Sequence, residues 1–438
     1  MRQRDSLARR LIEQAGAEVG VDWWDSVRRD HAQRVADTGL PSRRQENWRY
    51  TSLARLDKQE LEPARNRGHA LQAEDMAPFG IPDWPAERMV FINGFFVPEL
   101  SCLPDSMDLR VTSLRSVDDP QLEGFRPLLE RQFQSPESAF AALNTAIAVD
   151  GALIEVAAGA QPEHPLECIY LTLPEEQALA CHLRNMIILG EGARLSLMER
   201  FVSMGEPSYL SNCVNQFRLS EGARLTHVRL QQESSAGSLI TRTDVEQSER
   251  SHYEYCGIDL GGNLVRHDIN VSLEGSDSAA SVAGLYALDG ERHVDNHVRM
   301  DHRSRDARSE TFFKGVMDDR SRAVFNGKVV VQPGADGTDA SQTNRNLLLS
   351  RQAEVDTKPE LEIYADDVKC AHGATVGQLD EDQMFYLRSR GISQDDARVL
   401  LIYAFCRQVV DRLESESLRD YVAGQVLGHL PGNQEETE

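Results

Sequence analysis

The spacing of apolar residues predicts helices at the start of the chain. Residues 5–15 and 21–36 place apolar side chains at helical intervals, and Gly39-Leu40-Pro41 ends the second run. Further on, the chain becomes rich in proline, with Pro78, Pro82 and Pro85. We therefore expect an N-terminal helical domain and linker over residues 1–85.

From residue 86 to residue 375 the pattern predicts a core of short strands. The stretch MVFINGFFV places Asn93-Gly94 between two β-prone runs, which is typical of a tight hairpin. One helical segment, residues 139–147, interrupts the strands. The absence of long helices between the later strands disfavours a doubly wound α/β sheet.

An internal repeat points to the architecture of this core. LGEGARLSLMERF at 189–201 returns as LSEGARLTHVRLQ at 219–231, which is a period of 30 residues, and a looser copy begins at Leu273. A strand, a glycine turn and a strand at a fixed period favour a β-solenoid, in which each unit buries its apolar face on the next. A β-sandwich with two similar hairpins remains the alternative.

The last part of the chain, residues 376–438, returns to helical spacing. Asp380 and Ser393 stand where N-caps are expected, and Gly391 separates the two runs. The second run carries a wide apolar stripe with Tyr403 and Phe405 near its centre. Such a stripe usually packs on its own domain, and a partner surface is the second interpretation. The final residues, NQEETE, are expected to be disordered.

Charge and cysteine content limit the classes of function. The chain has 47 basic and 70 acidic residues, a net charge of −23, so nucleic acid and acidic membranes are unfavourable partners. No apolar stretch approaches the roughly 20 residues that span a bilayer, and we expect no secretory signal because no apolar region follows the first charged residues. Seven scattered cysteines without a CxxC motif are typical of the reducing cytoplasm.

The common signatures of catalysis are missing. The sequence contains no GxxxxGK[ST] phosphate loop, no GxGxxG after a strand and no GxSxG elbow. The run RHVDNHVRMDH at 292–302 alternates, so Val294 and Val298 face one way and His293 and His297 the other. These two histidines are roughly 13 Å apart on a strand, too far to share a metal unaided, so we expect a hydrated face with hydrogen-bonded histidines.

Cys370 and His372 are the candidate metal ligands. Two residues apart on an extended segment, they point to one side with Cα atoms roughly 7 Å apart. Thiolate and imidazole bind zinc, iron and iron–sulfur clusters. Two ligands do not complete a site, so either another segment or another chain supplies the rest, or the pair is a buried thiol beside a hydrogen-bonded histidine.

Residues 312–392 resemble the C-terminal core of the SufB/SufD family of iron–sulfur cluster assembly proteins. The resemblance rests on NRNLLLS, TKPELEIYADDVKCAHGATVG and FYLRSRGI, and PSRRQENWRYTSL near the start is similar to the family's N-terminal segment. The segment ADDVKCAHGAT is more similar to the SufD branch of the family, with the SufB branch as the alternative. The middle third of the chain is the least distinctive.

The resemblance implies a fold and a set of partners. It implies a right-handed parallel β-helix between helical ends, working as a non-catalytic scaffold with SufB and with the ATPase SufC. SufC would dock on the C-terminal helical domain. The aromatic and basic residues expected to contact it are Phe385, Tyr386, Arg390, Tyr403 and Phe405. An isolated chain could pair with itself through exposed strand edges.

The resemblance also implies a role for the candidate ligands. His372 would take part in forming a transient iron–sulfur cluster or in binding iron at the SufB interface, with Cys370 as its neighbour, and a reduced flavin in the complex is an open point. A rival of another class is a β-helix polysaccharide lyase or hydrolase. Such an enzyme would need a groove of paired carboxylates or calcium-binding acids, and usually an export signal.

Overall fold

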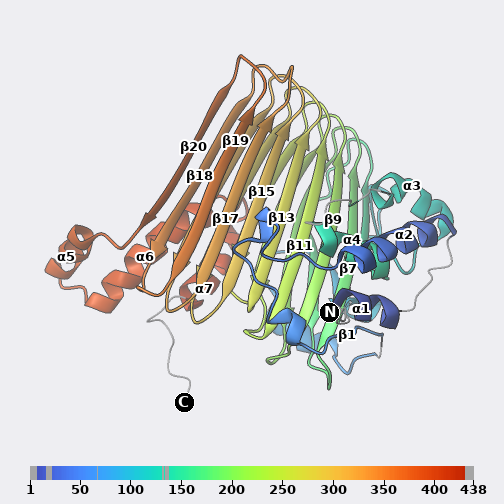
Figure 1. Ribbon diagram of the computed structural model, residues 1–438, viewed down its shortest axis with the longest axis horizontal. Helices are drawn as coiled ribbons and strands as arrows, with labels where there is room; N and C mark the ends of the chain where they lie inside the picture. Colours follow the sequence, from blue (N-terminus) through green and yellow to red (C-terminus); the bar gives the residue numbers. More distant parts are fainter. Residues whose placement is uncertain (1–6, 16–21, 67, 131–132, 134–137, 430–438) are drawn as a thin grey trace.

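The computed structural model describes residues 7–15, 22–66, 68–130, 133 and 138–429. The tail NQEETE and positions 5, 6 and 21 of the predicted helices lie outside these residues. Two sheets of ten strands dominate the described chain, which passes alternately between them (Figure 1).

Sheet A contains the odd-numbered strands from β5 to β19, together with β1 and β4. Its strands are β4 (Leu109–Ser113), β5 (Ala152–Val156), β7 (Leu179–Leu189), β9 (Tyr209–Leu219), β11 (Gly237–Gln247), β13 (Leu264–Leu273), β15 (His293–His302), β17 (Arg322–Val331) and β19 (Glu354–Ile363), with β1 (Glu62–Pro63) beside β7. From β5 to β19, neighbouring strands are parallel, because each is one coil further along the chain.

Sheet B contains β2 and the even-numbered strands from β6 to β20, together with β3. They are β2 (Glu87–Ile92) with β3 (Phe95–Phe96), β6 (Leu166–Thr172), β8 (Arg194–Ser203), β10 (Arg224–Gln232), β12 (His252–Asp259), β14 (Ala279–Leu288), β16 (Arg308–Met317), β18 (Asp339–Leu348) and β20 (Lys369–Gly377). The two sheets face each other, and together they form a β-solenoid, which confirms the predicted fold class over the β-sandwich.

The 30-residue repeat corresponds to one coil. Arg194 pairs with Arg224 in sheet B, and Leu189 pairs with Leu219 in sheet A. Leu273 continues the same row, because it pairs with Gln247, which pairs with Leu219. The looser third copy is therefore also in register, two coils further on.

The glycine at a fixed offset has a conformational reason. Gly192 and Gly222 occupy the left-handed region with φ of 67° and 66°, where a side chain is disfavoured. The amide of Gly192 donates to the carbonyl of Glu221 on the next coil at 2.8 Å. In later coils the corresponding residues Arg250, Asp277 and Asp306 also have positive φ, so the turn is kept although the glycine is lost.

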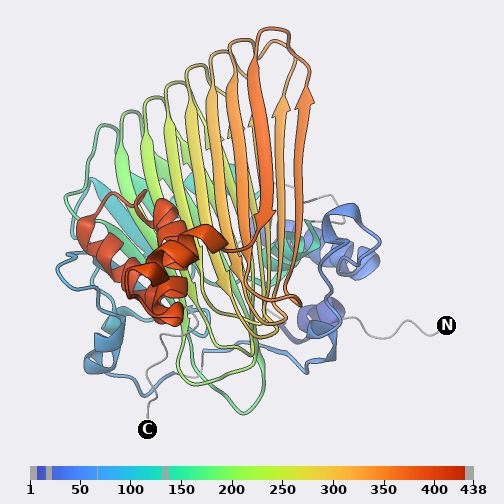
Figure 2. The ribbon, with the colours of Figure 1, turned by 90° about the vertical axis from the view of Figure 1, so that its left-hand side faces the viewer.

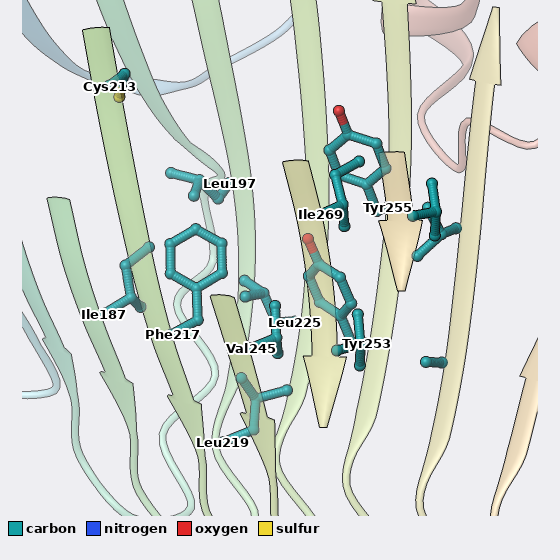
Figure 3. Packing of buried hydrophobic residues seen from close by; sticks show 14 of the residues in the cluster. Ile187, Leu197, Cys213, Phe217, Leu219, Leu225, Val245, Tyr253, Tyr255 and Ile269 are labelled. Atoms are coloured by element: carbon teal, nitrogen blue, oxygen red, sulfur yellow. The ribbon is translucent and has the colours of Figure 1, made fainter. Parts of the chain in front are cut away.

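Inward side chains form one apolar core along the solenoid (Figure 3). Phe217 and Tyr253 are buried there, and Phe217 stands among Ile187, Leu197 and Leu225 in the picture. Several polar groups in the interior are hydrogen-bonded to one another, as for Glu199 and His227, whose side chains lie 2.9 Å apart. Buried polar groups need such partners, so these contacts tie neighbouring coils together.

Seven helices are described, and all of them except α5 pack against the sheets. They are α1 (Leu7–Ala15), α2 (Asp22–Thr38), α3 (Asp119–Leu129), α4 (Ala139–Ile147), α5 (Glu381–Ser389), α6 (Gln394–Val410) and α7 (Glu416–His429). Short 3₁₀ turns are η1 (Glu46–Trp48), η2 (Leu56–Lys58), η3 (Ala73–Phe79) and η4 (Pro98–Leu100). Helices α1 and α4 share an apolar cluster with sheet A, and α6 and α7 share one with sheet B (Figure 2).

Several local predictions are confirmed. Asn93 and Gly94 both have positive φ and join the antiparallel strands β2 and β3. The Asp380 carboxylate accepts two main-chain N–H groups at the start of α5, and the Ser393 hydroxyl accepts the amide of Asp396 in α6. Each cap satisfies amides that have no partner inside the helix.

Candidate functional site

The candidate ligands lie at the open end of the solenoid. Strands β19 and β20 are the last strands of sheets A and B, so each has one edge without a described neighbour (Figure 1). No residue of either strand is buried. The side chains of Ile363 and Val376 are 41% and 49% exposed, although such residues are usually buried in a core. The last coil therefore presents an uncovered face.

Cys370 and His372 share the inward-facing side of β20. Cys370 pairs with Ala340 and His372 with Gln342, and both of these β18 residues are buried. Cys370 is half-buried and packs against the apolar core, whereas His372 is exposed. Burial, together with the nearby charge of Asp339, raises the pKa of the Cys370 thiol.

The pair supplies an incomplete donor set. In the part of the chain that the structure describes, no group of three His, Cys, Asp or Glu residues is arranged to hold a metal ion. An imidazole and a thiolate are suitable ligands for iron or zinc, but a tetrahedral site needs four donors. Any metal held by Cys370 and His372 would therefore need ligands from outside these residues.

The predicted docking residues fall into two groups. Phe385 and Tyr386 on α5 are 74% and 57% exposed, and the guanidinium of Arg390 lies 5.2 Å from the Tyr386 ring centre. No described residue of α5 is buried. These three residues form one exposed aromatic and basic surface, which we call the α5 surface.

Tyr403 and Phe405 on α6 lie closer to the solenoid. Both are half-buried and pack against the apolar cluster between the C-terminal helices and sheet B. The ring centre of Phe405 is 3.9 Å from the Lys314 ammonium on β16. Leu400, which the sequence analysis did not single out, is 47% exposed on the same helix.

The N-terminal motif PSRRQENWRYTSL forms a strap across sheet A. The carboxylate of Glu46 pairs with Lys358 on β19 at 2.6 Å, and Trp48 lies under the Arg266 guanidinium at 4.0 Å. The Thr51 hydroxyl donates to Asp295 at 2.5 Å. We call residues 46–51 the N-terminal strap.

The N-terminal strap covers part of the polar face of the histidine run at residues 292–302, which the sequence predicts to be hydrated. Val294 and Val298 face the core as predicted, and His293 is hydrogen-bonded to Thr51 at 2.9 Å. However, Asp295 is only 1% exposed, because the strap and Arg266 cover it. This face is therefore less hydrated than the sequence predicts.

In the described residues, no helix is both long and apolar enough to cross a membrane.

Comparison with known proteins identifies the class. Residues 172–405 match the family model described as "SUF system FeS cluster assembly, SufBD core domain", and residues 9–168 match "SufBD protein N-terminal region". A β-solenoid with these two regions is an iron–sulfur cluster assembly protein of the SUF system. The chain belongs to the SufBD family.

The similar curated proteins agree with this placement. The iron–sulfur cluster assembly protein SufD of Escherichia coli is 33% identical, over 92% of each chain. A SufBD family protein of Synechocystis is 32% identical, over 90% of this chain and 89% of its own length. Protein ABCI7, chloroplastic, of Arabidopsis thaliana is 29% identical, over 92% of this chain and 86% of its own.

Proposed function

We propose that this chain is a non-catalytic scaffold subunit for iron–sulfur cluster assembly, acting in the cytoplasm with SufB and the ATPase SufC. The observation that carries the proposal is the open last coil, where an exposed imidazole and a half-buried thiol stand on one face of β20, an edge strand with a described neighbour on one side only. The name of the Escherichia coli relative favours the SufD branch over SufB. Family membership leaves the lyase or hydrolase interpretation without support, because a solenoid alone does not specify an activity.

The incomplete donor set is the main support for a shared site. His372 and Cys370 provide two ligands, and a SufB subunit lying against β19 and β20 provides the others for iron or a nascent cluster. Unpaired edge strands readily accept another chain, so a second copy of this protein pairs there when SufB is scarce. A reduced flavin would bind to the assembled complex rather than to this chain alone.

The α5 surface is the proposed contact for SufC. Its exposed rings and Arg390 are the residue types that concentrate binding energy at protein interfaces. Tyr403 and Phe405 are half-buried on the side of α6 that packs against sheet B, so they hold the docking helices on the solenoid. The ATP-dependent step then belongs to the partner, as the missing phosphate loop requires.

The test is anaerobic co-expression with SufB and SufC, followed by measurement of cluster yield in the purified complex. His372→Ala should leave the complex assembled but reduce the cluster yield at least tenfold, because one of few ligands is lost. His164→Ala is the matched control, since His164 is exposed outside the last coil. Normal cluster yield in His372→Ala would remove the proposed role of this residue.

A further inference from the structure

Helix α6 and the turn after it contact strand β16 and the residue after it at three points. The contacts are seven residues apart along the helical segment and four apart along the strand segment. The three pairs, helical segment first, are Arg398 with Asp318, Phe405 with Lys314, and Arg412 with Glu310; Arg412 lies two residues beyond the end of α6 and Asp318 one residue beyond the end of β16. Successive contacts are about 10 Å apart along the helical segment and about 13 Å apart along the strand segment. Because these two spacings are similar, all three contacts form at once between the antiparallel segments. The three pairs therefore set both the rotation and the axial position of α6.

The outer two contacts are ordinary ion pairs. Arg398 lies 2.9 Å from an Asp318 oxygen, and Arg412 donates to both oxygens of Glu310 at 2.8 Å. Both pairs are partly exposed, so each contributes little to the stability of the fold.

The middle contact differs in kind. Lys314 is only 1% exposed, and its ammonium donates to the main-chain carbonyl of Phe405 at 2.9 Å while facing the Phe405 ring. No carboxylate among the described residues pairs with it. A buried ammonium without a carboxylate costs stability, so its benefit must lie elsewhere.

The groups around Lys314 define its charge. Arg345 stands beside it on β18, and the Cys406 thiol faces it from α6. The nearest acid on β16, Glu310, is engaged by Arg412. Burial and the charge of Arg345 lower the pKa of Lys314 to about 8. The lysine is therefore mostly charged at neutral pH and neutral in mildly alkaline solution.

We propose that Lys314 is a positioning residue for partner docking: it sets how α6 lies on β16, and thereby how the α5 surface and Leu400 are presented. The docking half of this inference rests on the proposed function. The local half, that the Lys314 ammonium positions α6, stands on the contacts alone.

The pH dependence of this contact follows from the lowered pKa of Lys314. The folded pKa lies below the ordinary lysine value of 10.5, so the penalty for burying the charge falls as pH rises from about 8 to that value. Release of α6 from β16 returns the same ammonium to water, because Phe405 covers it, so α6 protection and the contribution of Lys314 to global stability both increase over this range. The contacts of Lys314 with Phe405 therefore fix the position of α6 and do not add to the strength with which the helix is held.

The experiment compares the full-length wild type with Lys314→Met, and Lys328→Met is the matched control because Lys328 pairs with Glu362 away from α6. Hydrogen exchange, corrected for intrinsic rates, is measured at pH 7 and pH 9, beside urea unfolding and SufC binding. At pH 7, Lys314→Met should lower the SufC affinity about tenfold without lowering either the protection of the α6 amides or global stability, because the positioning contacts with Phe405 are lost while the cost of burying a charge is removed. The wild type should gain α6 protection between pH 7 and pH 9, and Lys328→Met should behave as the wild type.

Each arm can fail on its own. Unchanged SufC affinity in Lys314→Met, or a loss of α6 protection in the wild type at pH 9, would overturn the proposal. The pH series on the wild type needs no variant, so it still decides the matter if Lys314→Met does not fold. If wild-type protein does not bind SufC at all, the proposed docking fails, while the exchange data still decide whether α6 covers the Lys314 ammonium.

Discussion

The two ends of the solenoid are built from the same coil but are finished differently. At the N-terminal end, antiparallel strands β4 and β3 pair with the parallel array, and helices α1 and α4 pack on its flank. Every residue of β7 except Ile188 is buried there, whereas no residue of β20 is buried. The strand pairing is equally regular at both ends. Exposure at the open end therefore reflects what is placed beside a coil, not how the coil is made.

Because of this difference, the covered coils and the last coil have separate roles, one in stability and the other in the candidate site. The covered coils hold the large apolar side chains that stabilise the fold, and the last coil carries the candidate ligands at little cost to the core. A partner can then bind an edge that is already in strand geometry.

The strongest test of the difference between the covered coils and the last coil is to remove one apolar side chain from each. Phe217→Ala opens a cavity among residues that cannot collapse onto it, so urea unfolding should show a loss of about 3–5 kcal/mol. Val376→Ala at the open end should change the free energy of unfolding by less than about 0.5 kcal/mol. Equal losses at the two sites would show that the last coil is covered in solution by the chain itself.

A second, smaller effect depends on pH. Burial raises the pKa of Glu233, which lies between β10 and β11, to about 7. The folded state thus holds this proton more tightly than the unfolded chain, so the stabilising contribution is complete below about pH 4.5 and is lost as pH rises through about 7. At pH 8, Glu233→Gln should raise the free energy of unfolding by at most about 3 kcal/mol, which thermal unfolding shows as a higher melting temperature. At pH 5 the increase should be much smaller. Asp366→Asn, at an exposed position between β19 and β20, serves as control, and a pH-independent gain in Glu233→Gln would contradict the assignment.

The smallest expected effect concerns the column of left-handed turns, which runs from the covered coils toward the open end. Gly222→Ala forces a side chain into φ of 66° and should cost about 1 kcal/mol. Asp277→Gly, at φ of 55° in the same column, should be neutral or stabilising by up to about 1 kcal/mol. Thermal unfolding of the two variants decides the point, and the same sign for both would mean that the column does not share one conformation.

Local signals in the sequence were reliable where one residue decides the backbone. Asn93-Gly94 predicted the hairpin, and Asp380 and Ser393 predicted the starts of two helices, because the conformational preference or capping bond lies within a few residues. The repeated EGAR turn predicted the coil for the same reason, since the positive φ of its glycine is a local requirement.

Contacts between distant segments were not predictable in this way. The pattern of α6 gave an apolar stripe, but it did not show that Phe405 would lie over Lys314, 91 residues earlier. Nor did RQENWRYT show that Trp48 would lie under Arg266 or that Thr51 would cover Asp295. Such pairs depend on which outer face of the solenoid each segment crosses.

The sequence by itself determined the coil length, the inward and outward alternation and the types of the candidate ligands, because period, polarity and residue chemistry are written in adjacent positions. Only the tertiary structure decided that Cys370 and His372 stand on the last, uncovered coil. A strand becomes an edge through the absence of a neighbour in space, and no residue within the strand specifies that.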